Sequence, residues 1–154
     1  MKFVLRLLGV GALPLALGAL LNFIMPFLSI PGYVLAILLL AAWGFMAFKL
    51  TNPAHNSGLQ ALSLCTFGLF VLLLALYQEF TIGGYWQNWI GAATQIFFLP
   101  WLPLGYSIAT SIFPLTGPIK LWPIYTAAWV ILFIASWIGC AVKSQTQRSK
   151  SSDK

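Results

Sequence analysis

The stretch LQALSLCTFGLFVLLLALY, residues 59–77, is predominantly apolar and carries no charged side chain. As a helix it would extend about 28 Å, which is enough to cross the hydrocarbon core of a bilayer. Three further apolar runs of similar length occupy residues 7–28, 33–50 and 121–142. The four runs predict four membrane-spanning helices.

The scarcity of charge along the chain supports the same interpretation. Only 6% of the residues are charged, 60% are hydrophobic, and the mean hydropathy is +0.92. Soluble domains have about 25% charged residues, so most of this protein's surface must face lipid rather than water. We therefore predict an all-α integral membrane protein, a four-transmembrane-helix bundle. Between Arg6 and Lys143 the charged residues are Lys49, Glu79 and Lys120.

The positions of the basic residues predict the orientation of the chain. Cytoplasmic segments of membrane proteins are enriched in Lys and Arg. Lys2 and Arg6 precede the first run, and a basic tail follows the fourth, so we expect both termini in the cytoplasm of a plasma or bacterial inner membrane. Residues 1–142 would form one membrane domain. The Ser-, Lys- and Gln-rich residues 143–154 are predicted to be a disordered cytoplasmic tail.

A long segment, residues 78–120, separates the third and fourth runs on the predicted outer face. Residues 91–113 are apolar enough for a fifth span, but Pro100 and Pro103 would interrupt its helix. A fifth span would also place the basic tail outside. We favour four spans, with this segment re-entering the membrane or lying at its interface. Its predicted parts are helix 91–99, a break at 100–103 and helix 104–113.

Aromatic side chains concentrate in and around this outer segment. Trp and Tyr are typical of a belt at the membrane–water interface. The alternative is an aromatic groove for a lipid tail, a peptide or a partner's helix, because the prolines and the pair Gly83-Gly84 give the segment an irregular shape. The candidate groove residues are Tyr85, Trp86, Trp89, Trp101, Tyr106 and Trp122.

Few polar side chains accompany these aromatics. Glu79 is the only acid before the tail, and it is either an interfacial carboxylate exposed to water or the partner of Lys120 across the mouth of the segment. Thr94 and Gln95 would be further polar contacts if the segment lines a path for a transported molecule or lipid.

Small residues form one face of the first apolar run. Glycine and alanine allow two helices to approach closely, and an asparagine can add a hydrogen bond between them. We predict a helix-packing face, used either inside the protein's own bundle or against another subunit. Its members are Gly9, Ala12, Ala16, Ala19 and Asn22.

The sequence contains no recognisable arrangement for catalysis or metal binding. Cys65 and Cys140 lie apart in apolar runs without a CxxC motif, so we expect no metal and no cofactor. Glu79 without a second acid or a nearby histidine is a poor general acid or base. The net charge of +6 is scattered rather than gathered on one face, which argues against nucleic acid as a partner.

These observations favour a function in binding rather than chemistry. We expect a small multi-pass, non-catalytic accessory or structural subunit of a larger membrane complex, or a protein that binds such a complex. Its partners would be membrane lipid and another membrane protein or a second copy of the chain. A small transporter or lipid-handling protein that uses the outer segment as a path or groove is the alternative. A membrane enzyme of unknown reaction is the second alternative.

Overall fold

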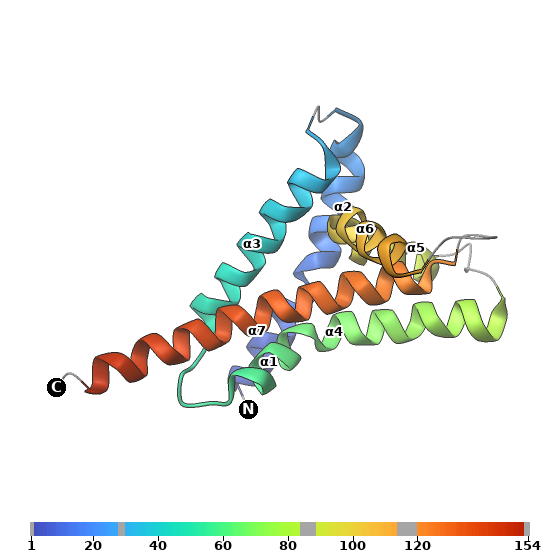
Figure 1. Ribbon diagram of the computed structural model, residues 1–154. Coiled ribbons are helices and arrows are strands. Elements are labelled where there is room, and N and C mark those ends of the chain that lie inside the picture. Colours follow the sequence, from blue (N-terminus) through green and yellow to red (C-terminus); the bar gives the residue numbers. More distant parts are fainter. Residues whose placement is uncertain (1, 28–29, 84–88, 114–119, 153–154) are drawn as a thin grey trace.

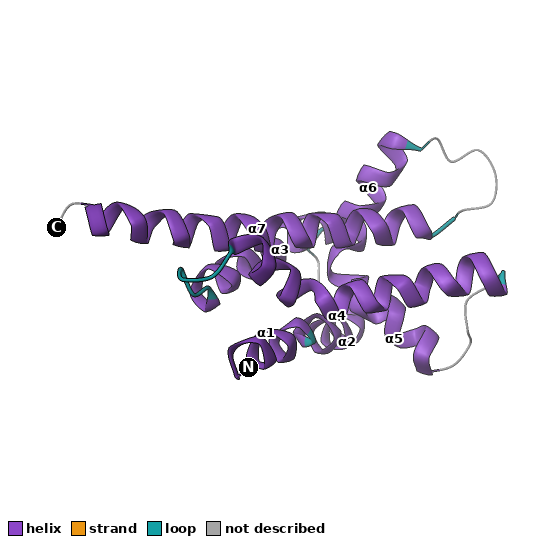
Figure 2. Cartoon of the chain, turned by 90° about the horizontal axis from the view of Figure 1, so that it is seen from below, coloured by secondary structure: helices purple, strands orange, loops and turns teal. Residues whose placement is uncertain are grey.

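The computed structural model describes residues 2–27, 30–83, 89–113 and 120–152. Every regular element in these ranges is helical (Figure 2). The elements are α1 (Lys2–Gly11), α2 (Leu13–Ile24), η1 (Met25–Phe27), α3 (Gly32–Leu50), α4 (Ser57–Tyr77), η2 (Gln78–Ile82), α5 (Trp89–Phe98), η3 (Leu99–Trp101), α6 (Leu102–Ile112) and α7 (Trp122–Ser152).

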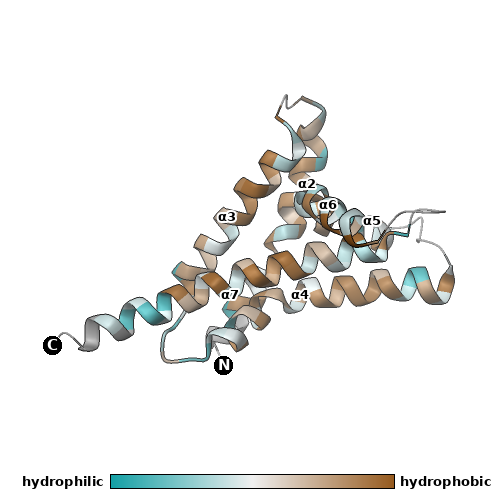
Figure 3. Cartoon of the chain, in the orientation of Figure 1, coloured by the Kyte–Doolittle hydropathy of each residue, from teal (hydrophilic) through white to brown (hydrophobic). Residues whose placement is uncertain are grey.

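Four helical stretches are long and apolar enough to cross a membrane: Arg6–Phe27, Gly32–Leu50, Ser57–Ile82 and Trp122–Gln147. Each of them overlaps one of the four runs predicted from the sequence, so the all-helical class and the four helices of membrane-spanning length are confirmed. Figure 3 shows hydrophobic residues along α3, α4 and most of α7, and hydrophilic residues in the last turns of α7. These features indicate an integral membrane protein.

Two of the spanning stretches are irregular. The first is divided at Ala12, and Pro14 occupies the first turn of α2, where its missing N–H costs no hydrogen bond. The third continues beyond Tyr77 into η2, a wider π-helical turn. Gly83 ends η2 with a positive φ of 74°, a conformation that glycine adopts without a steric penalty.

The helices form two arms that separate at one end of the molecule (Figure 1). One arm is the antiparallel pair α4 and α7, which pack against each other. The other arm holds α2 and α3, which diverge from η1, and α3 packs against α7 where the arms converge. The two termini and the loop 51–56 lie at the end where the arms converge, here called the terminal end. The opposite end, here called the open end, holds η1, η2 and the start of α7.

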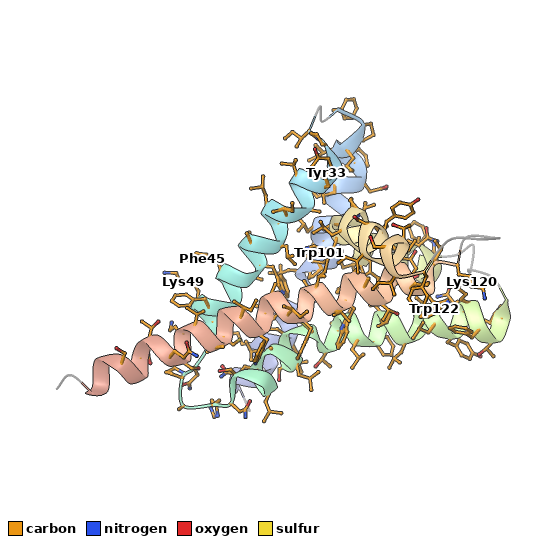
Figure 4. All side chains as sticks on the ribbon, in the orientation of Figure 1. Tyr33, Phe45, Lys49, Trp101, Lys120 and Trp122 are labelled. Atoms are coloured by element: carbon orange, nitrogen blue, oxygen red, sulfur yellow. The ribbon has the colours of Figure 1, made fainter. Side chains whose placement is uncertain are left out.

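The segment α5–η3–α6 occupies the space between the arms. α5 packs against α2 and α4, η3 contacts both α2 and α3, and α6 packs against α7 and α3. Trp101 of η3 has no exposed surface, and Phe97 and Phe98 of α5 are equally buried. Figure 4 shows Trp101 near the centre of the molecule. This segment therefore supplies the three largest fully buried side chains among the described residues.

Pro100 and Pro103 lie at the interruption between α5 and α6, because a proline has no backbone N–H to donate within a continuous helix. Pro100 lies within η3, and Pro103 occupies the first turn of α6, where a proline is tolerated. The two helices are thus Trp89–Phe98 and Leu102–Ile112, each within two residues of the predicted range.

A small polar junction fixes α3, α4 and α7 to one another. Trp43 Nε1 donates a hydrogen bond of 2.7 Å to Ser136 Oγ, which in turn donates to the backbone oxygen of Leu132 at 2.9 Å. The Sγ atom of Cys65 lies 3.3 Å from the same Oγ. Because no water competes for these groups in the core, the junction holds the three helices in register.

A buried amide organises the loop at the terminal end. Gln60 Nε2 donates to the backbone oxygens of Asn52 and His55, at 2.9 and 3.0 Å, and its Oε1 accepts from the N–H of Asn52 at 2.8 Å. Asn56 accepts the N–H groups of Gly58 and Leu59 and so caps α4. The loop is therefore attached to the first turns of α4.

The tail differs from the prediction. Residues 143–154 were expected to be disordered, yet α7 continues through Ser152. Its Lys, Gln and Arg residues are good helix formers, and extension of an existing helix avoids the cost of nucleation. Neither glycine nor proline follows Gly139 to end the helix.

Candidate functional site

Glu79 connects the end of the third span to the start of the fourth. One of its carboxylate oxygens accepts the N–H of Trp122 at 2.8 Å, and the other accepts the N–H of Leu121 at 3.2 Å. The first N–H groups of a helix have no partner within it and carry a partial positive charge. Glu79 therefore caps α7 from a different element.

Pairing of Glu79 with the Lys120 side chain was one of two alternatives from the sequence, beside an interfacial carboxylate. The hydrogen bonds given above join Glu79 to the backbone of the two residues after Lys120, and Lys120 itself is exposed. A signal for this role exists in the sequence, because Ile119, Lys120 and Leu121 offer no side-chain acceptor to cap the helix that follows.

Three aromatic rings cluster beside the Glu79 cap, at the tip of the arm formed by α4 and α7. The ring centroid of Trp122 lies 6.0 Å from that of Phe80 and 5.6 Å from that of Phe113. The three rings belong to η2, to α7 and to the residue that follows α6. Figure 4 shows Trp122 and Lys120 close together at this end, far from Lys49.

The other residues of the predicted aromatic groove are dispersed. Trp101 lies in the core, Tyr106 is half exposed on α6, and Trp89 is 92% exposed at the start of α5. Tyr85 and Trp86 lie outside the described residues. The four described members of the set, Trp122 included, thus lie in different elements and differ widely in exposure.

Thr94 and Gln95 are neighbours on α5 but face different surroundings. Thr94 is buried, and its hydroxyl donates to the backbone oxygen of Gly91 at 2.7 Å. Gln95 is exposed and lines a cavity. Of the two predicted polar contacts, Gln95 is thus the one whose side chain is available.

The cavity beside Gln95 has a lining that is partly polar and partly apolar. Its volume is about 290 Å³, and it lies where α2, α5 and α7 meet. Asn22 from the first span reaches it, so two carboxamides from distant parts of the chain come together. Nothing in the sequence pattern links these two residues. The lining consists of Asn22, Ala92, Gln95, Ile96, Leu99, Leu102 and Tyr125.

A larger apolar cleft of about 460 Å³ separates α2 from α3. Trp43 and Trp101 line it, with their ring centroids 6.1 Å apart and nearly perpendicular. Trp101 Nε1 is buried and has no hydrogen-bond partner among the described residues. The other lining residues are Leu13, Pro14, Ala16, Leu17, Leu20, Leu39, Ala42 and Met46.

The predicted helix-packing face of the first span is not the face that packs inside this protein. Its members Gly9, Ala16, Ala19 and Asn22 are exposed, and Ala12 is only partly buried. The buried face lies beside the predicted one on the helix. The glycines that approach a neighbouring backbone are Gly11 and Gly18. The buried residues are Leu7, Gly11, Pro14, Gly18 and Leu21.

Gly11 and Gly18 permit the close helix contacts on that buried face. A Cβ atom at Gly11 would lie 2.6 Å from the backbone oxygen of Leu64, and one at Gly18 would clash with that of Ile96. At Gly9, by contrast, a Cβ atom would have no neighbour within 4 Å. The exposed small-residue face is defined as Gly9, Ala16 and Ala19. A Cβ atom at Gly9 would meet no described residue, and Ala16 lines the cleft between α2 and α3.

The described residues contain no group of three or more His, Cys, Asp and Glu side chains that could hold a metal ion. Cys65 and Cys140 are buried free thiols, and Glu79 is engaged as a helix cap. Comparison with protein-family models, curated proteins and solved structures gives no match for this chain.

Proposed function

We propose that this protein is a non-catalytic integral membrane protein that binds a helix of a partner membrane protein. The observation that carries the proposal is the exposed small-residue face of Gly9, Ala16 and Ala19 on α1 and α2. Such a protein would be an accessory subunit of a membrane complex or would bind to one.

The contrast between the two faces of the first span supports this function. Gly11 and Gly18 serve internal contacts, whereas a Cβ atom at Gly9 would have no described neighbour within 4 Å. A glycine in a helix costs roughly 1 kcal/mol relative to alanine, and lipid can be faced equally well by leucine. Small exposed residues become useful when a second helix approaches the backbone closely.

The same proposal includes an orientation in the membrane. Lys49 lies in the last turn of α3, at the end of the molecule that holds both termini. The positive-inside rule then places the terminal end in the cytoplasm of a plasma or bacterial inner membrane. The segment α5–η3–α6 would enter from the outer face and return to it. Burial of η3 by α2 and α3 supports such a re-entrant element, because irregular backbone at membrane depth needs protein around it.

Co-purification with matched variants tests the function. The tagged protein is isolated in a mild detergent from its native membrane, and we expect a stoichiometric companion. Gly9→Leu combined with Ala19→Leu should remove the companion, whereas Ala41→Leu, on an exposed position of α3, should retain it. A photo-crosslinker at residue 19, but not at residue 41, should attach to a helix of that companion.

Two results would contradict the proposal. One is a folded protein that purifies without a companion from its native membrane. The other is a companion that the Gly9→Leu, Ala19→Leu variant binds as well as the wild type does. A crosslink from residue 19 to a second copy of the chain would replace the partner protein with self-association.

Lipid handling is a second candidate function, favoured by the apolar cleft between α2 and α3. A cleft of this kind offers room for an acyl chain at membrane depth. Vesicles that contain the purified protein and a fluorescent phospholipid provide the test. Lipid movement between the leaflets at the rate of protein-free vesicles would exclude transport of that lipid.

A further inference from the structure

We propose that the cavity lined by Asn22, Gln95 and Tyr125 binds the glycerol–ester region of a membrane lipid. This site is separate from the small-residue face and does not depend on a protein partner. Three properties of the cavity carry the inference: its polar groups, its depth and its size.

The polar groups are two carboxamides that need a hydrogen-bond partner. Neither Asn22 nor Gln95 makes a side-chain hydrogen bond to another described residue, although both line the cavity. A carboxamide provides two N–H donors and one acceptor, and in apolar surroundings it loses free energy when these are unused. The ester carbonyls of a lipid are acceptors of the right kind.

The depth of the two residues agrees with the level of those carbonyls. Asn22 precedes the end of the first span, at Phe27, by a distance of about 8 Å along the helix. Gln95 lies at most about 9 Å along α5 from Trp89, whose exposed indole is typical of the interface. Two elements thus place the carboxamides near the outer boundary of the hydrocarbon core.

The size and lining of the cavity suit the ester region of a lipid. Its volume is about 290 Å³. The remaining lining is apolar, with Ala92, Ile96 and Leu99 among its members, which suits the first methylenes of two acyl chains. The lining contains no charged side chain, so the site recognises the ester region rather than the phosphate.

Tyr125 forms a wall of this cavity. Its side chain is buried, and its ring stacks on that of Phe98 with centroids 5.3 Å apart. Because Phe98 precedes η3 directly, the wall is part of the core between the arms. The cavity is therefore bounded by rigid elements on the α7 side.

An ester–ether comparison tests the site. Dioleoyl phosphatidylcholine and its diether analogue share a headgroup and chains, but only the ester has carbonyl oxygens. Native mass spectrometry of the delipidated protein in detergent should show the ester lipid bound about tenfold more tightly than the ether lipid. The difference is expected because the carbonyl oxygens accept hydrogen bonds from the two carboxamides. Asn22→Leu combined with Gln95→Leu should abolish this preference. Gln145→Leu, at the terminal end, should retain it.

A second measurement keeps the test decisive if the double variant fails to fold. Phosphatidylcholine with a photoreactive diazirine on the acyl chain beside the ester should label the wild-type peptide that contains Gln95. Equal binding of ester and ether lipids by the wild type would overturn the proposal. So would labelling of other peptides only, or an unchanged preference in the folded double variant.

Discussion

Trp43 of α3 and Ser136 of α7 are 93 residues apart in sequence and meet in a hydrogen bond of 2.7 Å in the core. The indole N–H donates to the serine hydroxyl, which itself donates a hydrogen bond to the backbone oxygen of Leu132, one turn earlier in α7. Cys65 of α4 touches the same hydroxyl. One small side chain thus joins three of the four helices of membrane-spanning length.

Ser136→Ala should lower the stability of the protein by about 0.5–2 kcal/mol, because it leaves the indole N–H of Trp43 without an acceptor. Unfolding in mixed micelles, monitored by tryptophan fluorescence, measures the change. Ser63→Ala is the control, since the Ser63 hydroxyl bonds only to its own helix, at Leu59. Equal losses in the two variants would show that the junction contributes nothing.

Glu79→Ala should loosen the start of α7 by removing the acceptor of two backbone N–H groups. We expect a loss of about 1 kcal/mol and faster amide hydrogen exchange at Leu121 and Trp122. Glu79→Gln should have a smaller effect, because it retains one acceptor oxygen. Lys120→Ala should leave the exchange unchanged. Slower exchange in Glu79→Ala than in the wild type would contradict the capping role.

Glycine substitutions should separate the two faces of the first span. Gly18→Ala places a methyl group against the backbone oxygen of Ile96, so we expect a marked loss of thermal stability. Gly9→Ala meets no neighbour within 4 Å and should stabilise the isolated protein by about 0.5–1 kcal/mol. The thermal midpoints of both variants in one detergent provide the comparison, and the reverse order would refute the assigned packing.

Trp101→Ala should be the most damaging single truncation of an aromatic residue in this chain. It removes a completely buried side chain from between α2 and α3, with an expected cost of about 3–5 kcal/mol. Trp89→Ala, at a position that is 92% exposed, should cost little. Spin labels at residues 20 and 39 would report the distribution of distances between α2 and α3. This distribution should broaden in the Trp101→Ala variant and not in the Trp89→Ala variant.

Several elements could be predicted from the sequence because they depend on local chemistry. Runs such as 59–77 are too apolar for a water-exposed surface, and a helix is the only local structure that satisfies their backbone at that length. Pro100 and Pro103 interrupt a helix whatever surrounds them, so the division between α5 and α6 was also predictable. Helical continuation beyond residue 143 was missed, since composition alone does not reveal that a preceding helix will extend.

The features that sequence analysis missed depend on tertiary neighbours. Gly9 and Gly11 look equivalent in the sequence, and only the position of α4 decides which of them is buried. The two hydrogen bonds described above join Glu79 to backbone N–H groups. Every residue except proline has such a group, so the sequence does not reveal which ones Glu79 accepts. Asn22 and Gln95 line one cavity because α5 packs against α2, a contact that no local pattern encodes.

The central position of η3 also affects the order of assembly. The ribosome completes α2 and α3 before α4, and it adds Trp101 only after α4 has been made. We therefore expect α2 and α3 to reach their final spacing only after α4 and η3 have been made, so that the closing of this protein is a late event rather than a stepwise addition of finished hairpins.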